Sequence, residues 1–451
     1  MSLYVPASLE GLLSLFSCCF TRPTFQTFRA LVVGQVSQTG LRTVTGMLVG
    51  ARLSGVCHHA RAHRFFTCAR WSTDRLGLAL TAMICERLLA PGETVVVAVD
   101  DTLCPRVGAK VHACSWHRDV TGHRGRLVAK WGNSWVVAGI VLRLPFLDRP
   151  VCLPVLFRLW RPKRKQFGKN KSDPERPGKP ALARGMIDLI SERLPDRTLR
   201  VLGDSGYAGR SWRGLEDRVT VIFRLRQQAA LYAPAPPTSG RRGRPRSWGP
   251  KLGSVAQLAT DPDSQWASTT VHWYEQRAQT VRFLAVEGLW EPLGPDTPVR
   301  IIIVREHTRP KDKPAAVLLT TELDATPAQT IERYADRWPI EVSFQQAKQL
   351  FGIGDARNRT INAVERTVPF QFLAMSLTIA WYALHGHHPD VVSEHRRRAP
   401  WYQTKTTPSF ADMLAKLRRV ILAAQYHPGT HQQPTPREIN LVQQAWAAAG
   451  L

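Results

Sequence analysis

Two short runs of β-branched and aliphatic residues, each followed closely by aspartate, constrain the fold of this chain more than any other feature. Residues 94–99 read Thr-Val-Val-Val-Ala-Val and lead into Asp100-Asp101-Thr102. Residues 198–202 lead in the same way into Gly203-Asp204-Ser205-Gly206-Tyr207. Apolar runs of this length predict strands that are buried on both faces of a sheet. Acids at the ends of separate strands meet only if the fold brings those strand ends together.

The order of elements around these runs predicts an α/β fold. Strands are expected at 134–144 and 151–159, a helix at 181–194 and a further strand at 219–225. Three strands, a helix, a strand with an acid at its tip and another strand form the order that an RNase H-like core would give. Adjacent strand ends of such a core bring their acids together.

Downstream of Asp204 the sequence predicts a β-rich insertion and then helices. Strand patterns recur at 269–274, 280–286, 299–304 and 316–320. Thr326-Pro327 is typical of an N-cap followed by proline at the first helical position, and Pro339 starts a second helix. The domains expected on this basis are a helical N-terminal DNA-binding region at 1–90, an RNase H-like core at 91–230 and 326–390, the β-rich insertion at 231–325, and a helical C-terminal region at 391–451.

The charge of the chain indicates a polyanionic partner. Its 61 Lys and Arg residues outnumber 35 Asp and Glu residues, which gives a net charge of +26, and nucleic acid is the commonest polyanion in a cell. Because 44% of the residues are hydrophobic, disorder throughout is excluded. No apolar run approaches the roughly 18 residues of a membrane span. The 8 cysteines form no Cys-x-x-Cys pair, so we expect reduced thiols. We therefore expect a cytoplasmic, nucleoid-associated protein that does not bind a membrane.

Three basic segments are candidates for DNA contact. Residues 58–66 mix His and Arg with Phe, and this pattern fits a helical DNA-binding module or an ordinary helix with a solvated basic face. A basic loop follows the strand at 151–159, and a segment rich in Pro and Gly at 234–253 is either a DNA-contacting loop or a solvated linker. The basic residues expected to contact DNA are Lys163, Arg164 and Lys165 in the loop and Arg241, Arg242 and Arg244 in the segment.

Four residues at fixed spacing near the start of the second helix include a further candidate acid, Glu341. Tyr334, Arg337, Glu341 and Lys348 stand in the order Tyr-x2-Arg-x3-Glu-x6-Lys. On a helix, Glu341, Gln345 and Lys348 share one face. Lys348 and Arg337 can therefore reach a phosphate near the carboxylate, and Tyr334 can stack on a base or donate to phosphate.

The acids of the three sites have the chemistry needed to cut a phosphodiester bond. Two Mg²⁺ ions bound by carboxylate oxygens activate the attacking water or 3′-hydroxyl and stabilise the leaving oxygen. The candidate catalytic residues are Asp100, Asp101, Asp204 and Glu341. Because pleating turns Asp100 and Asp101 to opposite faces, only one of that pair can easily face the metals.

The Tyr334-to-Lys348 box, with the two strand–aspartate sequences, resembles the bacterial insertion-sequence transposases of the DDE class. The resemblance is closest to the branch that has a β-rich insertion between the second Asp and the Glu, and it spans roughly residues 64 to 348. It implies an enzyme that binds double-stranded DNA at terminal inverted repeats as a homodimer and nicks it there. The freed 3′-hydroxyl then attacks the opposite strand or the target DNA.

The resemblance also implies the roles of individual residues. The metal ligands would be Asp100, Asp204 and Glu341, with Asp100 preferred over Asp101 because family members commonly show Asp, a variable residue and then Thr. The cofactor would be two Mg²⁺ ions, for which Mn²⁺ can substitute. Arg337 and Lys348 would hold phosphate, with Tyr334 alongside.

Other functions are compatible with parts of the sequence. One is a transposase-derived DNA-binding regulator, although such a protein has no physical need for three converging carboxylates. Another is a nuclease that cuts but does not join strands, whose active site would look the same. An RNA-associated basic protein is the third, and the chain shows no RNA-recognition motif to favour it.

Overall fold

The computed structural model of the chain describes residues 5–119, 128–164, 173–236, 246–273, 277–306, 315–401 and 403–426. Four of the residues expected to contact DNA lie outside these ranges, and the predictions for them stay predictions: Lys165, Arg241, Arg242 and Arg244.

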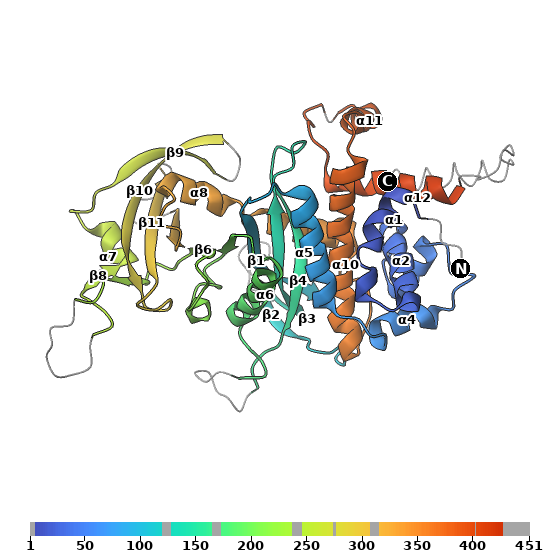
Figure 1. Cartoon of the computed structure of the whole chain (residues 1–451), viewed down its shortest axis with the longest axis horizontal. Coiled ribbons are helices and arrows are strands. Elements are labelled where there is room, and N and C mark those ends of the chain that lie inside the picture. Colours follow the sequence, from blue (N-terminus) through green and yellow to red (C-terminus); the bar gives the residue numbers. More distant parts are fainter. Residues whose placement is uncertain are drawn as a thin grey trace.

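A large mixed sheet runs through the molecule (Figure 1). In the described part of the chain it has 12 strands in the order β2-β3-β1-β5-β6-β12-β11-β10-β7-β8, with β4 paired to β3 and β9 to β10. The α/β class predicted from the sequence is confirmed. The strands are β1 (Val95–Pro105), β2 (Ser115–Asp119), β3 (Val128–Leu142), β4 (Val151–Trp160), β5 (Leu199–Gly203), β6 (Val219–Arg224), β7 (Ala230–Tyr232), β8 (Lys251–Ser254), β9 (Ala267–Trp273), β10 (Arg277–Trp290), β11 (Pro298–Glu306) and β12 (Ala316–Thr320).

The centre of the sheet is built from the apolar runs seen in the sequence. β5 lies between β1 and β6 and is parallel to both. The side chains of Val97 and Val99 in β1 and of Val201 in β5 are fully buried, as expected for strands covered on both faces. β1 does not stop where its apolar run ends. It continues antiparallel to β3 as far as the pair Pro105↔Gly132.

Helices gather around β4 and the long helix α10. α5, α6, α9 and α10 pack against β4, and α1, α2, α4 and α12 pack around α10. In Figure 1 α1, α2, α4, α10 and α12 lie towards one end of the molecule, β9, β10 and β11 lie at the other, and α5 and α6 lie between them beside the central strands. The helices are α1 (Ala7–Ser14), α2 (Arg22–Ser37), α3 (Val44–Gly50), α4 (His59–Thr67), α5 (Thr73–Leu88), α6 (Lys179–Arg193), α7 (Val255–Thr260), α8 (Pro327–Ala335), α9 (Pro339–Leu350), α10 (Ile361–Trp381), α11 (Asp390–Arg398) and α12 (Phe410–Tyr426).

Helix α10 corrects an expectation from the sequence. With the π-helical turn that follows it, the segment Ile361–Gly386 has 26 residues and an 18-residue window of mean hydropathy 1.3, which is long and apolar enough to cross a membrane. The expectation considered uninterrupted apolar runs, which Gln371, Ser376 and Thr378 break here, and it did not anticipate a helix that qualifies by its mean hydropathy. In the structure 89% of that window is buried inside the protein, so α10 is accounted for as a core helix.

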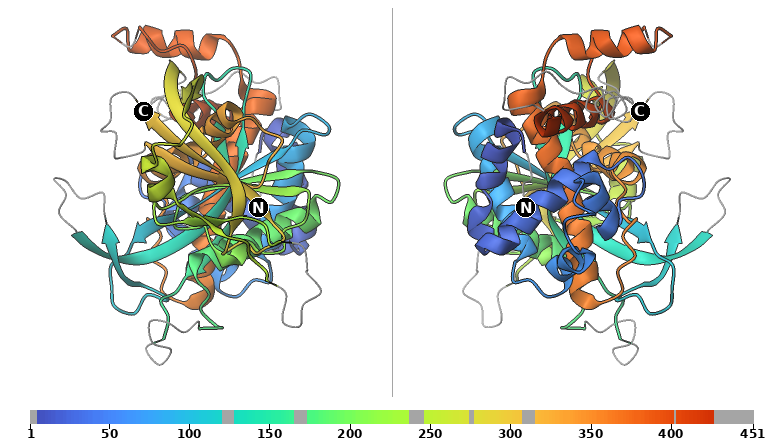
Figure 2. Two further views of the ribbon diagram at one scale, coloured as in Figure 1. Left: turned by 90° about the vertical axis from the view of Figure 1, so that its left-hand side faces the viewer. Right: turned by 90° about the vertical axis from the view of Figure 1, so that its right-hand side faces the viewer.

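The strands that follow Asp204 extend the central sheet. β12 pairs antiparallel with β6 through Thr320↔Ile222 and Leu318↔Arg224, and β11 and β10 continue outward from it. Figure 2 (left) shows these strands in front of the central ones, with the hairpin of β2 and β3 projecting to the side. A second apolar cluster, separate from the one around α10, packs α8 against this part of the sheet.

Candidate active site

Asp100 and Asp204 lie side by side because the strands that lead to them are parallel neighbours. β1 and β5 pair in register up to Val99↔Gly203, and each aspartate is the next residue along its strand. A shift of one residue would turn every buried side chain to the other face, so the apolar runs fix this register. The two carboxylates therefore share one edge of the β1–β5 pair.

Arg337 joins Asp100 to Glu341. Its Nη1 donates to Oδ2 of Asp100 at 2.8 Å, and its Nη2 donates to Oε1 of Glu341 at 2.5 Å. The Arg337 side chain is only 11% exposed. A planar guanidinium with several donors suits two carboxylates at once. Asp100 and Glu341 thus face each other across a shared cation.

The acids at this edge act on one another electrostatically. The pKa of Asp100 is raised to about 7: burial raises it most, Arg337 and the backbone N–H of Asp101 lower it, and the charges of Asp204 and Asp101 add smaller rises. Burial also raises the pKa of Tyr207 well above its ordinary value, and the three aspartates add to that rise. Negative charge therefore exceeds positive charge at this edge of the sheet.

Asp101 has different partners from Asp100. Nζ of Lys179 lies 2.5 Å from Oδ2 of Asp101, and the hydroxyl of Tyr207 donates to its Oδ1 at 3.3 Å. Successive side chains of a strand point to opposite faces, and for this reason Asp100 and Asp101 bind different partners. Of the two neighbours, Asp100 is the one that shares a partner with Glu341.

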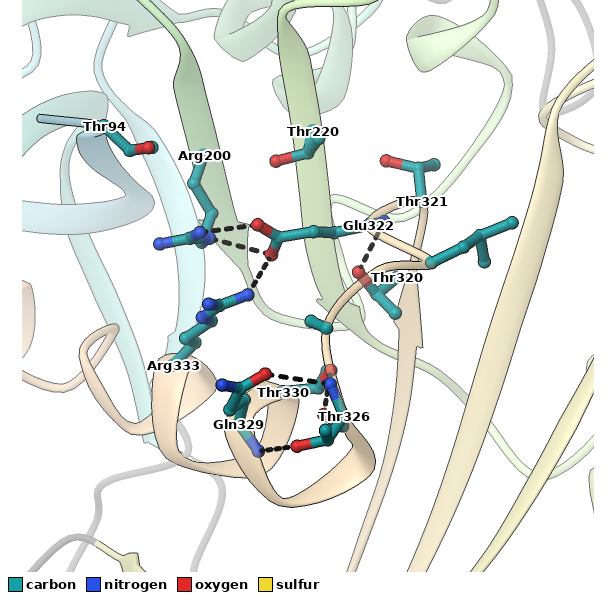
Figure 3. Close-up of polar contacts among 12 residues, drawn as sticks. Thr94, Arg200, Thr220, Thr320, Thr321, Glu322, Thr326, Gln329, Thr330 and Arg333 are labelled. Carbon is teal, nitrogen blue, oxygen red and sulfur yellow. Dashed lines mark hydrogen bonds and ion pairs between the residues drawn. The ribbon is translucent and has the colours of Figure 1, made fainter. Parts of the chain in front are cut away.

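A partly buried group of ion pairs fixes helix α8 to strand β5. Glu322, in the connection from β12 to α8, accepts hydrogen bonds from Arg200 at 3.0 and 2.6 Å and pairs with Arg333 at 2.9 Å (Figure 3). Burial raises the pKa of Glu322, but the two arginines lower it overall. Arg200 lies on the strand that ends before Asp204, and Arg333 lies one helical turn before Arg337. The group therefore connects strand β5, which leads to Asp204, to helix α8, which leads towards Glu341.

Helix α8, which leads towards Glu341, and helix α9, which contains it, both begin where the sequence predicts. At the start of α8 the Oγ1 of Thr326 accepts from the Gln329 backbone N–H at 3.2 Å, and Oε1 of Gln329 accepts from the Thr326 backbone N–H at 3.0 Å (Figure 3). This capping box satisfies two N–H groups that have no partner inside the helix. Helix α9 then begins at Pro339, so Glu341 lies in its first turn.

Two members of the spaced box differ in exposure. Tyr334 is 2% exposed and packs in the apolar cluster beneath α8, with the Arg337 guanidinium carbon 6.0 Å from its ring centre. In this position it packs beside Arg337, and its expected contact with DNA stays a prediction. Lys348 is exposed and close enough to β1 for its charge to lower the pKa of Cys104 slightly against the larger rise from burial.

The described part of the basic loop is held by acids. Arg164 pairs with Asp173 at 2.9 Å and with Glu175 at 2.7 Å, and Asp173 is 2% exposed. Arg164 therefore connects the segment after β4 to the segment before α6. Lys163 is exposed and remains a candidate for phosphate contact.

The donor chemistry of the acids fits a hard divalent cation, but their arrangement is not a finished three-carboxylate cage. Carboxylate oxygens are the ligands that Mg²⁺ prefers, and Asp100 and Asp204 supply them from adjacent strands. Glu341 reaches them only through Arg337. Within the residues that the structure describes, no group of three or more His, Cys, Asp or Glu side chains is placed to hold a metal ion.

A separate cavity of about 640 Å³ lies beside α9. It is lined by Val342 and Gln346 of that helix, by Trp338 just before it, and by residues of the turn between β3 and β4 and of the segment before α12. Neither Glu341 nor the aspartates of β1 and β5 line it. The acids therefore lie on a different part of the surface.

A mixed α/β sheet with acids at adjacent strand ends is compatible with a nuclease fold, and comparison with known families identifies the class. A family model described as DDE superfamily endonuclease matches residues 15–280. This match spans more than half of the chain, and the protein belongs to the DDE superfamily endonucleases. It includes Asp100 and Asp204 but ends before Glu341. No curated protein matches the chain significantly. Family members act on DNA and generally use divalent metal ions.

Sequence reasoning missed the residues that support the acids. No role was predicted for Lys179, Arg200, Glu322 or Arg333. Tyr207 was noted within its Gly-Asp-Ser-Gly-Tyr sequence but given no role. Spacing carries no signal for these contacts, because Lys179 and Asp101 are 78 residues apart in the chain. The one available signal was that some of these residues are charged although their neighbours in the strand or helix are apolar.

Proposed function

We propose that this endonuclease is a DNA transposase of the insertion-sequence type with an RNase H-like core. It cuts DNA at terminal inverted repeats and transfers the freed strand to target DNA by transesterification. The observation that carries the proposal is the register of β1 and β5, which places Asp100 beside Asp204, together with the Arg337 link from Asp100 to Glu341. Strands β7 to β12 correspond to the β-rich insertion of the family branch that the sequence resembles.

Asp100, Asp204 and Glu341 are the residues that would hold divalent ions, either Mg²⁺ or Mn²⁺. When bound, such ions activate the attacking oxygen and stabilise the leaving oxygen of a phosphodiester. Arg337 favours the ionised form of Asp100 against the larger effect of burial on its pKa, because an opposite charge stabilises a carboxylate. Lys348, exposed on the Glu341 face of α9, is placed to neutralise a phosphate of the DNA.

The partners follow from charge and from the family. A net charge of +26 favours binding to double-stranded DNA, which includes both the terminal repeats and the target. A homodimer would bring two transposon ends together. The protein would act on the nucleoid in the bacterial cytoplasm.

Two substitutions test the proposed catalysis. Asp204→Asn and Glu341→Gln each preserve shape and remove a charge, and we expect both to abolish cleavage of a labelled terminal repeat in Mg²⁺ while DNA binding stays nearly unchanged. Asp188→Asn on α6 is the matched control, because Asp188 is an exposed acid paired with Arg184 and should be neutral. Unchanged cutting by either active-site variant discards the assignment. Cutting without joined products identifies a nuclease, and binding without cutting by the natural chain identifies a regulator.

A further inference from the structure

Lys179 is a charged group beside the acids that neither the spaced box nor the basic segments include. It is the first residue of α6, and its ammonium binds Asp101 at 2.5 Å. Asp101 is fixed in turn by the hydroxyl of Tyr207. The position of Lys179 is thus set from β1 and from the loop that follows Asp204.

An aromatic side chain also contacts this ammonium. Nζ of Lys179 lies 5.5 Å from the ring centre of Trp160, at the end of β4, which is within the range of a cation–π interaction. His117 of β2 stacks edge-on against the same ring at 5.7 Å. Burial lowers the pKa of His117, and the charge of Lys179 lowers it further. Lys179 therefore lies where β2, β4 and α6 meet.

Arg337 and Lys179 each bind an aspartate of β1, but they differ in exposure and in the number of carboxylates they bind. Arg337 is 11% exposed and donates to two carboxylates. Lys179 is 29% exposed and donates to one. An ammonium has three N–H donors, so Lys179 retains donors that can bind a group arriving from solvent. A DNA phosphate that approaches Asp100 and Asp204 enters a region with excess negative charge and needs such a cation.

We propose that Lys179 binds a backbone phosphate of the DNA substrate beside the paired aspartates, and that Asp101 and Trp160 hold its ammonium in place. This inference rests on the proposed action on DNA. It assigns Asp101 a positioning role and leaves metal binding to Asp100.

A purely structural ion pair and a phosphate contact predict different relative effects for two substitutions. If the pair is only structural, Lys179→Gln and Asp101→Asn break the same interaction and act alike. If Lys179 binds phosphate, Lys179→Gln removes the contact, whereas Asp101→Asn keeps the ammonium and only loosens its position. The second substitution then weakens DNA binding less than the first and keeps the salt dependence of binding.

The experiment measures binding of the full-length protein to a short labelled DNA duplex by fluorescence anisotropy, in EDTA and over a series of salt concentrations. For Lys179→Gln we expect about tenfold weaker binding and a salt slope reduced by about 1, as for one lost phosphate contact. Lys179→Arg should restore the slope, and Asp101→Asn should keep it. Lys405→Gln is the matched control, because Lys405, which precedes α12, also pairs with an aspartate, Asp412 in the first turn of that helix.

Each result decides between the two interpretations. Melting temperatures of all variants are measured first, and Lys179→Ala, which also removes the charge, replaces the Gln variant if the latter does not fold. Equal weakening by Lys179→Gln and Asp101→Asn, or an unchanged salt slope for Lys179→Gln, overturns the inference while the proposed function stands. If the natural chain shows no salt-dependent binding to the duplex, the proposed function fails and the inference fails with it.

Discussion

Two groups of arginine and carboxylate side chains lie near β5. One has more arginines than acids, and the other has more acids than arginines. In one, a single acid, Glu322, is held by two arginines, Arg200 and Arg333. In the other, a single arginine, Arg337, is held by two acids, Asp100 and Glu341. Both groups are largely buried, and both connect the central strands to the helical segment 327–350.

The difference shows where the protein can accept a cation from outside. The carboxylate of Glu322 is saturated by its arginines, which lower its pKa. Around Arg337 the acids outnumber the cation, and Asp204 adds further negative charge that raises the pKa of Asp100. The Glu322 group therefore serves to fix α8, whereas the Arg337 group has the charge balance of a binding site.

The largest expected effect separates Asp100 from its neighbour. Asp100→Asn should reduce strand cleavage on the order of a thousandfold, because loss of a carboxylate ligand removes about 4 kcal/mol of transition-state stabilisation. Asp101→Asn should change the cleavage rate constant by less than about tenfold, the effect of a lost orienting partner. Single-turnover cleavage of a labelled duplex in Mg²⁺ gives both rate constants. Equal losses for the two variants would show that Asp101, too, belongs to the reacting group.

The next effect tests the comparison of the two groups directly. Glu322→Gln and Arg337→Gln each leave charges without their partner, and each should lower the free energy of unfolding by about 3 kcal/mol. Added Mg²⁺ should raise the melting temperature of the Arg337 variant more than that of the natural chain, because it relieves repulsion between acids that have lost their cation. It should not stabilise the Glu322 variant, which has two excess arginines.

Urea unfolding and thermal melting with and without Mg²⁺ measure these quantities. Asp74→Asn is a useful reference, because it breaks the Arg158–Asp74 pair between β4 and α5, and a half-exposed pair of this kind should cost at most about 1 kcal/mol. Equal responses of the Glu322 and Arg337 variants to Mg²⁺ would contradict the assignment of one group to structure and the other to cation binding.

The smallest effect concerns Tyr334. Because its ring is buried beneath α8, Tyr334→Phe should leave DNA affinity within about twofold of the natural chain and cost no more than about 1.5 kcal/mol of stability, the contribution of one hydrogen bond. Anisotropy titration and urea unfolding measure the two quantities. A loss of DNA affinity without a loss of stability would restore the DNA contact that the sequence suggested.

The sequence predicted those parts of the fold that depend on local pattern. The strand at 316–320 was placed within its observed bounds, and the N-cap at Thr326 was identified because its residue types report a local hydrogen-bond arrangement. The short strands β7 and β8 were missed, since the breaker-rich sequence around them masks a period of two. Pairing partners far apart in the chain leave no such pattern.

The candidate site shows the same limit. Asp100, Asp204 and Glu341 could be proposed from strand ends and from spacing, but the sequence could not show that Arg337 lies between two of them. That contact joins residues 237 positions apart, and it exists because β12, α8 and Glu322 bring the helix back to β1. The buried position of Tyr334 has the same origin, since its box spacing says nothing about which side of α8 faces the sheet.

The enclosure of α10 determines how this protein can be shortened. Helices from both ends of the chain, α1, α2 and α4 on the one hand and α12 on the other, cover its apolar surface. A polypeptide that started at residue 91 would leave much of that surface facing water, and such surfaces promote aggregation. Proteolysis near residue 90 should accordingly yield insoluble fragments, and the acid-bearing strands must be produced together with the terminal helices.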